Sequence, residues 1–114
     1  MPPLRLKVLH IEDNEEDHAL VAVHLRRGGI DADIRRIDSE PELNEALFED
    51  WDLILCDYNL PGYSGLAALD KVRALGKLVP FILVSGEIGE DIAVQAMRNG
   101  ANDYLRSEER RVGK

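Results

Sequence analysis

The chain has 114 residues, 45% of them hydrophobic and 32% charged, which suits one globular domain with one core. Its net charge of −8 argues against binding to nucleic acid or to anionic membranes through a basic surface. No apolar run approaches the roughly 18 residues of a membrane span, and no signal-peptide pattern opens the chain, so we expect a cytoplasmic protein.

Strand-like and helix-like patterns alternate along the chain. The first strand is expected over residues 6–11 and the second over 32–37, and Asp13 or Asn14 can cap the helix between them. A capping box, Ser39 with Glu42, opens the second helix. Apolar runs at 53–56 and 80–85 are the third and fourth strands, and a fifth strand is expected to begin at 103–105. Helices that start near residues 66 and 92 separate these strands. Strict alternation predicts an α/β fold, a doubly wound parallel sheet with helices on both faces.

The central apolar run, Leu53–Cys56, ends in a carboxylate, Asp57, and a turn signal follows at Pro61-Gly62. Ligands and chemistry gather outside the carboxyl ends of strands in such sheets, so Asp57 is placed where a reactive group is expected. The alternative is that Asp57 only begins a turn, which is a common role for aspartate. Cys56 precedes it inside the apolar run and is expected to be a buried thiol.

Polar groups stand at three strand ends: Glu12 and Asp13 after the first, Asp57 after the third, and Ser85 at the fourth. If these strands are neighbours, three carboxylates converge, and a hard cation such as Mg²⁺ would relieve their repulsion. The metal would also favour phosphoryl transfer to a carboxylate nucleophile. The competing interpretation is that the acids after the first strand only cap a helix.

The chain resembles the receiver domains of two-component response regulators over about residues 5–105. The resemblance rests on four segments in order: Val8–Asn14 (VLHIEDN), Asp57–Gly65 (DYNLPGYSG), Pro80–Gly86 (PFILVSG) and Gly100–Leu105 (GANDYL). The segment Val84–Asp91 (VSGEIGED) is also similar to receivers of PAS-containing hybrid sensor kinases. The resemblance implies a flavodoxin-like five-stranded sheet with strand order 2-1-3-4-5.

The resemblance implies roles for the residues at the strand ends. Asp57 would be the phosphoacceptor, taking a phosphoryl group from a histidine kinase or a histidine phosphotransfer protein, and Ser85 would hydrogen-bond that group. Asp13 and Asp57 would bind Mg²⁺, or Mn²⁺, through their side chains. Asn59 would bind the metal through its backbone carbonyl and Glu12 through water.

The resemblance is incomplete among the residues that would couple phosphorylation to a change of conformation. Tyr104 and Ser85 would be the switch residues, and Asn59 and Glu87 would tune the lifetime of the phosphoaspartate. The family has a lysine three residues after the aromatic of the fifth strand, but Ser107 stands there in this chain. A serine is too short and carries no charge to pair with the acceptor.

The last residues, 106–114 (RSEERRVGK), have one apolar residue and no amphipathic period, so the fifth helix of the family is missing or truncated. We expect a receiver domain over 1–105, and we interpret 106–114 as a non-native or disordered tail that resembles translated sequencing-adapter read-through. The alternative is a natural, shortened receiver. Either way, apolar surface is left uncovered, which predicts a homo-oligomer through that surface or reduced stability.

Three functions remain open from the sequence. The leading one is a phosphoacceptor that is not an enzyme in the ordinary sense, although members of the family catalyse their own phosphotransfer and autodephosphorylation. A phosphorylation-impaired pseudo-receiver is favoured by the missing lysine. A phosphatase of the haloacid-dehalogenase kind is disfavoured. That class generally has a second acidic residue two positions after the nucleophile, where this chain has Asn59. The spacing of His10, His18 and His24 fits no metal site on one helix face.

Overall fold

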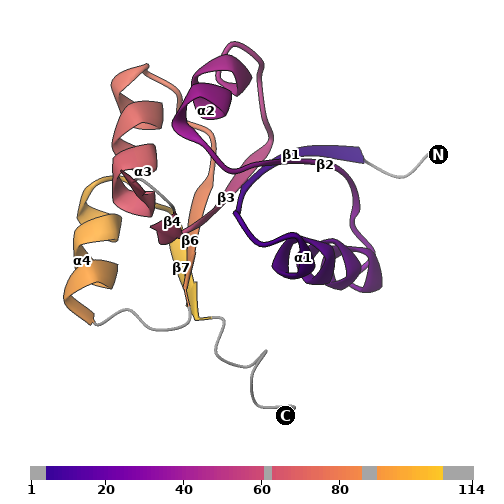
Figure 1. Ribbon diagram of the computed structural model, residues 1–114. Coiled ribbons are helices and arrows are strands. Elements are labelled where there is room, and N and C mark those ends of the chain that lie inside the picture. The colour runs from indigo at the N-terminus through magenta and orange to yellow at the C-terminus, as the bar shows by residue number, and fades with distance from the viewer. Residues whose placement is uncertain (1–4, 61–62, 86–89, 107–114) are drawn as a thin grey trace.

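The computed structural model describes residues 5–60, 63–85 and 90–106. Its main feature is one sheet of five parallel strands with helices on both sides (Figure 1). The strands are β1 (Arg5–Ile11), β2 (Asp31–Ile37), β3 (Leu53–Asp57), β6 (Phe81–Ser85) and β7 (Asp103–Arg106), and the helices are α1 (Glu15–Arg27), α2 (Glu40–Ala46), α3 (Gly65–Ala74) and α4 (Glu90–Arg98). A short antiparallel ribbon, β4 (Asn59–Leu60) with β5 (Tyr63–Ser64), follows β3.

The order of the strands across the sheet is β2-β1-β3-β6-β7. Counting only these five strands along the chain, this is the expected order 2-1-3-4-5, so the predicted flavodoxin-like fold is confirmed. The β4–β5 ribbon was not predicted. No helix in the described part of the chain is long and apolar enough to cross a membrane.

The hydrophobic core lies between the sheet and the helices α2, α3 and α4, which all cover one side (Figure 1). Alternate residues of three neighbouring strands fill it, and six of them have no exposed surface: Leu9, Ile11, Ile54, Cys56, Phe81 and Leu83. Burying a side chain of this size contributes about 1.5–3 kcal/mol. This core fixes the sheet, and the sheet in turn fixes where the strand ends meet.

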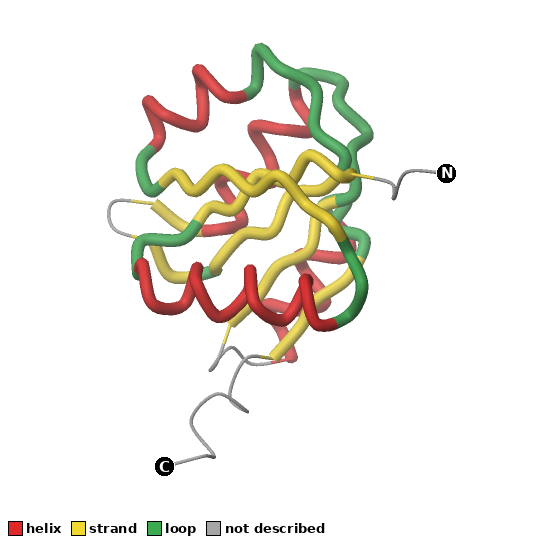
Figure 2. The backbone as a smooth tube through the Cα atoms, turned by 90° about the vertical axis from the view of Figure 1, so that its right-hand side faces the viewer, coloured by secondary structure: helices red, strands yellow, loops and turns green. Residues whose placement is uncertain are grey.

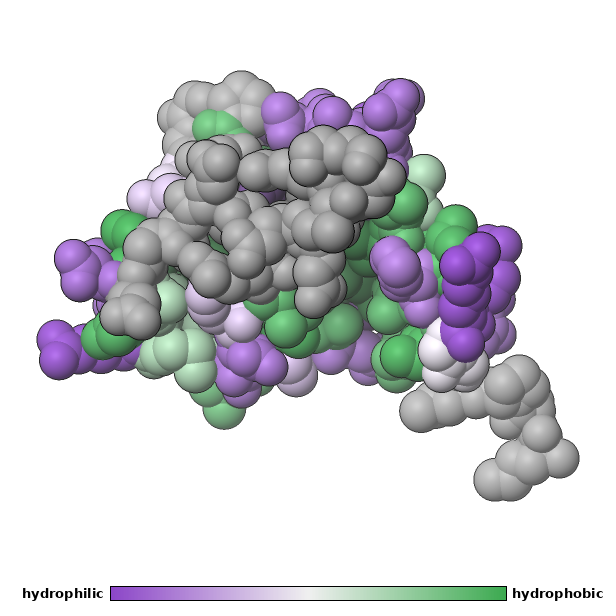
Figure 3. Space-filling model, turned by 90° about the horizontal axis from the view of Figure 1, so that it is seen from below, coloured by the Kyte–Doolittle hydropathy of each residue, from purple (hydrophilic) through white to green (hydrophobic). Residues whose placement is uncertain are grey.

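The other side of the sheet carries α1, which lies in front of the strands in Figure 2. No residue of α1 is fully buried. Leu20 of α1 and Leu105 of β7 are 41% and 47% exposed, and hydrophobic surface is visible beside the grey segments in Figure 3. On β1, by contrast, Val8 and His10 are buried, so the expected uncovered apolar surface is absent at these two described residues of that strand. Arg106, the first residue of the predicted tail 106–114, is the last residue of β7, so the fifth strand runs one residue further than expected. The rest of the predicted tail and the position of the fifth helix lie outside the described residues.

Polar side chains cap the starts of three helices. The side chain of Asn14 accepts a hydrogen bond from the backbone of Asp17 and caps α1. Ser39 caps α2, and the Glu42 carboxylate accepts hydrogen bonds from the Ser39 hydroxyl and from the backbone N–H of Asp38. The predicted Ser39–Glu42 pairing is therefore present, with the backbone donor one residue before the N-cap. Ser64 caps α3. Each such cap stabilises its helix by about 1 kcal/mol.

Candidate functional site

Three carboxylates from two strand ends meet at one point. Glu12 and Asp13 directly follow β1, Asp57 ends β3, and one carboxylate oxygen of each lies within 4.8 Å of the others. Because β1 and β3 are paired in parallel, with Ile11 opposite Cys56, their carboxyl ends reach the same edge of the sheet. The predicted convergence of these three acids is present in the structure.

Glu12 is the buried member of the cluster, with 4% of its surface exposed. Its carboxylate accepts a hydrogen bond of 3.2 Å from the backbone of Asn14, and its own backbone N–H donates to the carbonyl of Ile37. Burial is the main cause that raises the pKa of Glu12 to about 7, and the negative charge of Asp57 adds to it. Burial and the neighbouring charge of Asp57 therefore both disfavour the ionised form of Glu12.

The three residues that follow β1 make different contacts. Asn14 alone makes the capping contact to α1, while the Asp13 carboxylate belongs to the cluster. Arg36 of β2 approaches from the side, where its guanidinium donates to the backbone carbonyl of Glu12 at 3.1 Å and pairs with Glu15. Helix capping thus accounts for Asn14 but not for the Asp13 carboxylate, which lies in the cluster.

The turn after Asp57 is held tightly. The backbone N–H of Tyr58 donates to Val84, and that of Gly65 donates to the carbonyl of Tyr58 at 2.8 Å. A Cβ at Gly65 would lie 2.7 Å from a methyl of Leu83 and 2.8 Å from the carbonyl of Asp57, so only glycine fits here. Asn59 forms β4 and pairs with Ser64, which fixes the backbone just beyond Asp57. Backbone hydrogen bonds therefore hold the residues that directly follow Asp57.

The remaining predicted residues fall on β6, β7 and the undescribed segments. Ser85 ends β6 one position beyond Val84, which is paired with Asp57. Tyr104 of β7 packs against the core, and its buried hydroxyl has no hydrogen-bond partner among the described residues. Glu87 and Ser107 lie outside the described residues. The backbone therefore brings Ser85 to the same sheet edge as Asp57.

Sequence reasoning missed a contact between two histidines. His10 of β1 is buried, and its Nδ1 lies 2.9 Å from Nδ1 of His18 on α1, so one ring donates a hydrogen bond and the other accepts it. Burial, and then the charge of Arg36, lower the pKa of His18, which favours the neutral form that this contact needs. No single helix face links positions 10 and 18, so only the tertiary fold reveals the pair. It ties α1 to the sheet beside Glu12.

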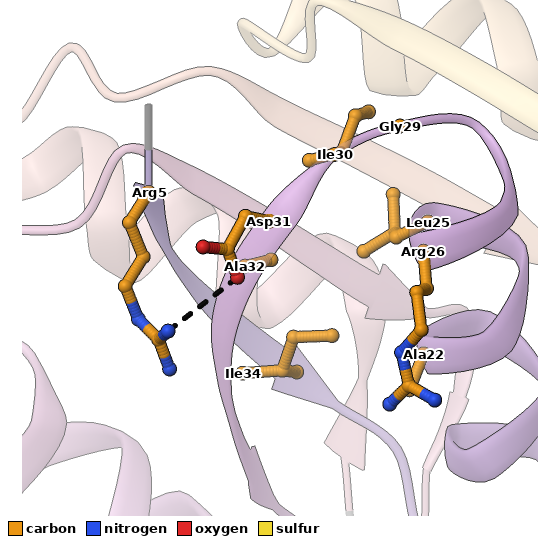
Figure 4. Close-up of a pocket in the computed structure, with 9 residues that line it drawn as sticks. All are labelled: Arg5, Ala22, Leu25, Arg26, Gly29, Ile30, Asp31, Ala32 and Ile34. Carbon is orange, nitrogen blue, oxygen red and sulfur yellow. Dashed lines mark hydrogen bonds and ion pairs between the residues drawn. The ribbon is translucent and has the colours of Figure 1, made fainter. Parts of the chain in front are cut away.

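The hollow shown in Figure 4 is not at the acidic cluster. It has a volume of about 510 Å³ and lies between α1 and the first residues of β1 and β2, with Arg5 and Arg26 standing on opposite sides. Arg5 pairs with Asp31 across 3.4 Å. Because the strands are parallel, this hollow is at the opposite end of the sheet from Asp57. We therefore place the candidate site at the three carboxylates.

Comparison with known sequences points to one family. The family model of the response regulator receiver domain matches residues 8–110. The transcriptional regulatory protein HprR of Escherichia coli is 35% identical over 88% of this chain and 44% of its own length. Response regulator ArlR of Staphylococcus saprophyticus is 30% identical over 87% of this chain and again 44% of its own length. The chain thus spans less than half the length of these two curated relatives.

Solved structures share the fold. A response regulator structure from Chloroflexus aurantiacus has a TM-score of 0.78 and 26% identity, covering 94% of this chain and 87% of its own. The receiver domain of sensor histidine kinase PA1611 from Pseudomonas aeruginosa has a TM-score of 0.75 and 25% identity, covering 96% of this chain and 94% of its own. That receiver holds a magnesium ion coordinated in its active site cleft.

Proposed function

Because the chain belongs to the response regulator receiver domain family, we propose that Asp57 accepts a phosphoryl group from a phosphohistidine. The donor would be a histidine kinase or a histidine phosphotransfer protein. The observation that supports this most is the meeting of three carboxylates at the end of β3, with Asp57 among them. A phosphatase of the haloacid-dehalogenase kind is not favoured, because the chain matches the receiver family and Asn59 replaces the second acid.

The donor atoms of the cluster fit a hard divalent cation. All are carboxylate oxygens that lie within 4.8 Å of one another, and PA1611 holds magnesium in its active site cleft. We propose that Asp13 and Asp57 bind Mg²⁺, or Mn²⁺, through their carboxylates, Asn59 through its carbonyl and Glu12 through water. When bound, the ion supplies positive charge that offsets the carboxylates and the phosphoryl oxygens.

The proposed transfer is an in-line displacement. A carboxylate oxygen of Asp57 forms a bond to phosphorus while the P–N bond to the donor imidazole breaks, and the nitrogen keeps the electron pair. The product is an acyl phosphate on Asp57, which water later hydrolyses to inorganic phosphate and the free carboxylate. Ser85 would hydrogen-bond the phosphoryl group, and Asn59 and Glu87 would tune how soon water attacks. In this sense the domain catalyses its own phosphorylation and dephosphorylation.

Tyr104 is the proposed switch residue, acting together with Ser85. Its hydroxyl is buried without a hydrogen-bond partner among the described residues, and leaving such a group unsatisfied costs about 1–3 kcal/mol. An outward rotamer would let water solvate the hydroxyl, whereas the inward one retains the packing against the core. Because each rotamer has one favourable contribution that the other lacks, we propose that both are accessible to the Tyr104 side chain.

One observation favours a second candidate function, a pseudo-receiver that binds partners without phosphorylation. Ser107 stands where the family carries a lysine, so no ammonium at that position pairs with the acceptor. We propose phosphorylation as the primary function because three carboxylates that could hold a metal ion meet at Asp57. In this proposal the domain acts in the cytoplasm, alone or within a longer protein, and does not bind nucleic acid itself.

One experiment separates the three functions. The purified chain is incubated with acetyl phosphate and Mg²⁺ and followed by intact mass, with EDTA as the control. The proposal expects a gain of one phosphoryl group that depends on the metal. Continuous release of phosphate from small phosphate esters would instead indicate a phosphatase, and neither phosphorylation nor Mg²⁺ binding would indicate a pseudo-receiver. A Ser107→Lys variant with faster phosphorylation would show what the missing lysine contributes.

We also propose that the side of β6 and β7 that carries Leu105 either supports association between copies or lowers the stability of the chain. Leu105 lies on this side and is 47% exposed, and its register partner Val84 is half-buried. Exposed apolar surface of this kind favours association or lowers stability. Its contribution is measured by the Leu105→Asp variant described below.

A further inference from the structure

The end of the molecule opposite Asp57 carries an unusual apolar surface. Phe48, Leu78 and Leu75 are 90%, 87% and 59% exposed, the three most exposed large hydrophobic side chains among the described residues. They lie after α2 and after α3, in the connections that lead into β3 and β6. Single exposed hydrophobic residues are ordinary, but a group of them on one surface marks a contact site.

These side chains belong to one continuous surface. Phe48 and Leu75 line a hollow of about 360 Å³ with Asn44, Leu47 and Lys77. Lys77 also lines a second hollow of about 300 Å³, together with Asp50, Trp51, Leu78 and Val79. An exposed phenylalanine thus lines the first of two hollows that share one lysine. We call the residues of these two hollows the Phe48 surface.

We propose that the Phe48 surface is a two-fold interface with a second copy of this chain. A two-fold axis brings the same patch of both copies together, so a projection and a hollow on one patch can fill each other. Phe48 of each copy would enter the hollow between Leu47 and Leu75 of the other. Shape alone would also admit a different partner, and the charges decide for a second copy.

The charges of the Phe48 surface suit self-association. It holds one lysine, Lys77, and one aspartate, Asp50, so its net charge is zero on a chain of net charge −8. Copies approaching through this patch avoid much of the repulsion that other faces would meet. Lys77 Nζ lies 3.7 Å from Asp50 Oδ1, and the Asp50 side chain is fully exposed. A two-fold axis can therefore place each lysine against the aspartate of the other copy.

The area buried between the two copies sets the expected affinity of the dimer. As a buried aromatic side chain, Phe48 would remove about 150–250 Å² from water in each copy, and Leu75 and Leu78 would add to this. Specific interfaces bury at least about 1,000–1,200 Å² in total. The polar rim of the patch would supply the rest of this area. We expect a weak dimer that forms at high protein concentration. Because the Phe48 surface lies at the amino ends of β3 and β6, both Asp57 ends would stay accessible in it.

Sedimentation velocity of the full chain from low micromolar to millimolar concentration tests the proposal. We expect a monomer–dimer equilibrium whose dissociation constant rises at least about tenfold in Phe48→Asp. Val94→Asp, which alters a half-exposed residue of α4, is the matched control and should dimerise like the wild type. Leu105→Asp tests the rival surface. A monomer at every concentration, or association lost in Leu105→Asp and retained in Phe48→Asp, would overturn the proposal.

Charge reversal tests the pairing between copies. Lys77→Asp and Asp50→Lys should each weaken self-association, since each homodimer would set like charges opposite one another. An equimolar mixture of the two variants should associate again, because both cross-copy pairs then have opposite signs. The pair within each copy stays broken in the mixture, so a purely internal role of Asp50 and Lys77 cannot restore association. A mixture that stays monomeric would contradict the proposed two-fold contact.

Discussion

Glu12 and Asp57 leave neighbouring strands and meet with their carboxylates at one sheet edge. Burial of Glu12, with the charge of Asp57 as the second cause, raises the pKa of Glu12 from 4.5 to about 7. A buried acid beside an ionised one keeps its proton unless a cation replaces it. Proton and metal should therefore compete for this site, which links the pH dependence of folding to metal binding.

The first prediction concerns stability without metal. Between pH 4.5 and about 7, the folded chain keeps a proton on Glu12 that the unfolded chain has released. The folded state then binds more protons, so the free energy of unfolding contributed by Glu12 falls as the pH rises through this window, by about 3 kcal/mol at most. The lowered pKa of His18 acts in the opposite direction, because it makes acid destabilising.

Glu12→Gln isolates the effect, because glutamine does not titrate. Urea denaturation in EDTA, from below pH 4.5 to above pH 7, should show the variant gaining stability relative to the wild type as the pH rises. Stability curves that run parallel throughout would show that the pKa of Glu12 is not raised in the folded chain.

The second prediction concerns Mg²⁺. Binding to the folded chain alone should raise its melting temperature, and at a hundredfold excess over the dissociation constant this stabilises it by about 2.7 kcal/mol. Asp13→Asn should remove most of the effect, whereas Asp70→Asn, an exposed change on α3, should not. The shift should shrink below pH 7, where Glu12 holds its proton. Calorimetric melting with and without Mg²⁺ measures this, and equal shifts in both variants would count against the proposed ligands.

The third prediction concerns the turn after Asp57. Gly65→Ala should lower the free energy of unfolding by about 2 kcal/mol, because its Cβ would press on Leu83 and on the carbonyl of Asp57. Gly28→Ala is the control, since its Cβ would meet only ordinary contacts at 3.5 and 3.6 Å. Denaturant midpoints compare the two. Equal free energies of unfolding for the two variants would mean that Leu83 and the backbone around Gly65 shift at little energetic cost.

The fourth prediction concerns Tyr104. Tyr104→Phe removes a buried hydroxyl without a partner among the described residues and keeps the ring, so it should raise the free energy of unfolding by about 1 kcal/mol. Tyr104→Ala removes the ring from the core and should lower it by about 3 kcal/mol. Thermal denaturation distinguishes them. A destabilised phenylalanine variant would mean that the hydroxyl has a partner.

The strands and helices could be predicted because their signals are local. The apolar run at Leu53–Cys56 and the capping box at Ser39 each depend on neighbours in the chain, and both were predicted and are present. The convergence of Glu12, Asp13 and Asp57 followed from a further rule, that parallel strands end at one edge.

What could not be predicted depends on contacts across the fold. The β4–β5 ribbon has two residues in each strand, too few for a periodic signal. The contact between His10 and His18 depends on where α1 crosses the sheet. Phe48 and Leu78 stand 30 positions apart in the sequence, and only the fold brings their connections to one end of the molecule.

The central claim is that Asp57 is the phosphoacceptor, and intact mass with peptide mapping tests it most directly. The wild type, Asp57→Asn and the control Asp70→Asn are each incubated with acetyl phosphate and Mg²⁺. The account predicts one added phosphoryl group on the wild type and on Asp70→Asn, mapped to Asp57, and none on Asp57→Asn. Equal phosphorylation of Asp57→Asn, or no phosphorylation of the wild type while it binds Mg²⁺, would contradict it.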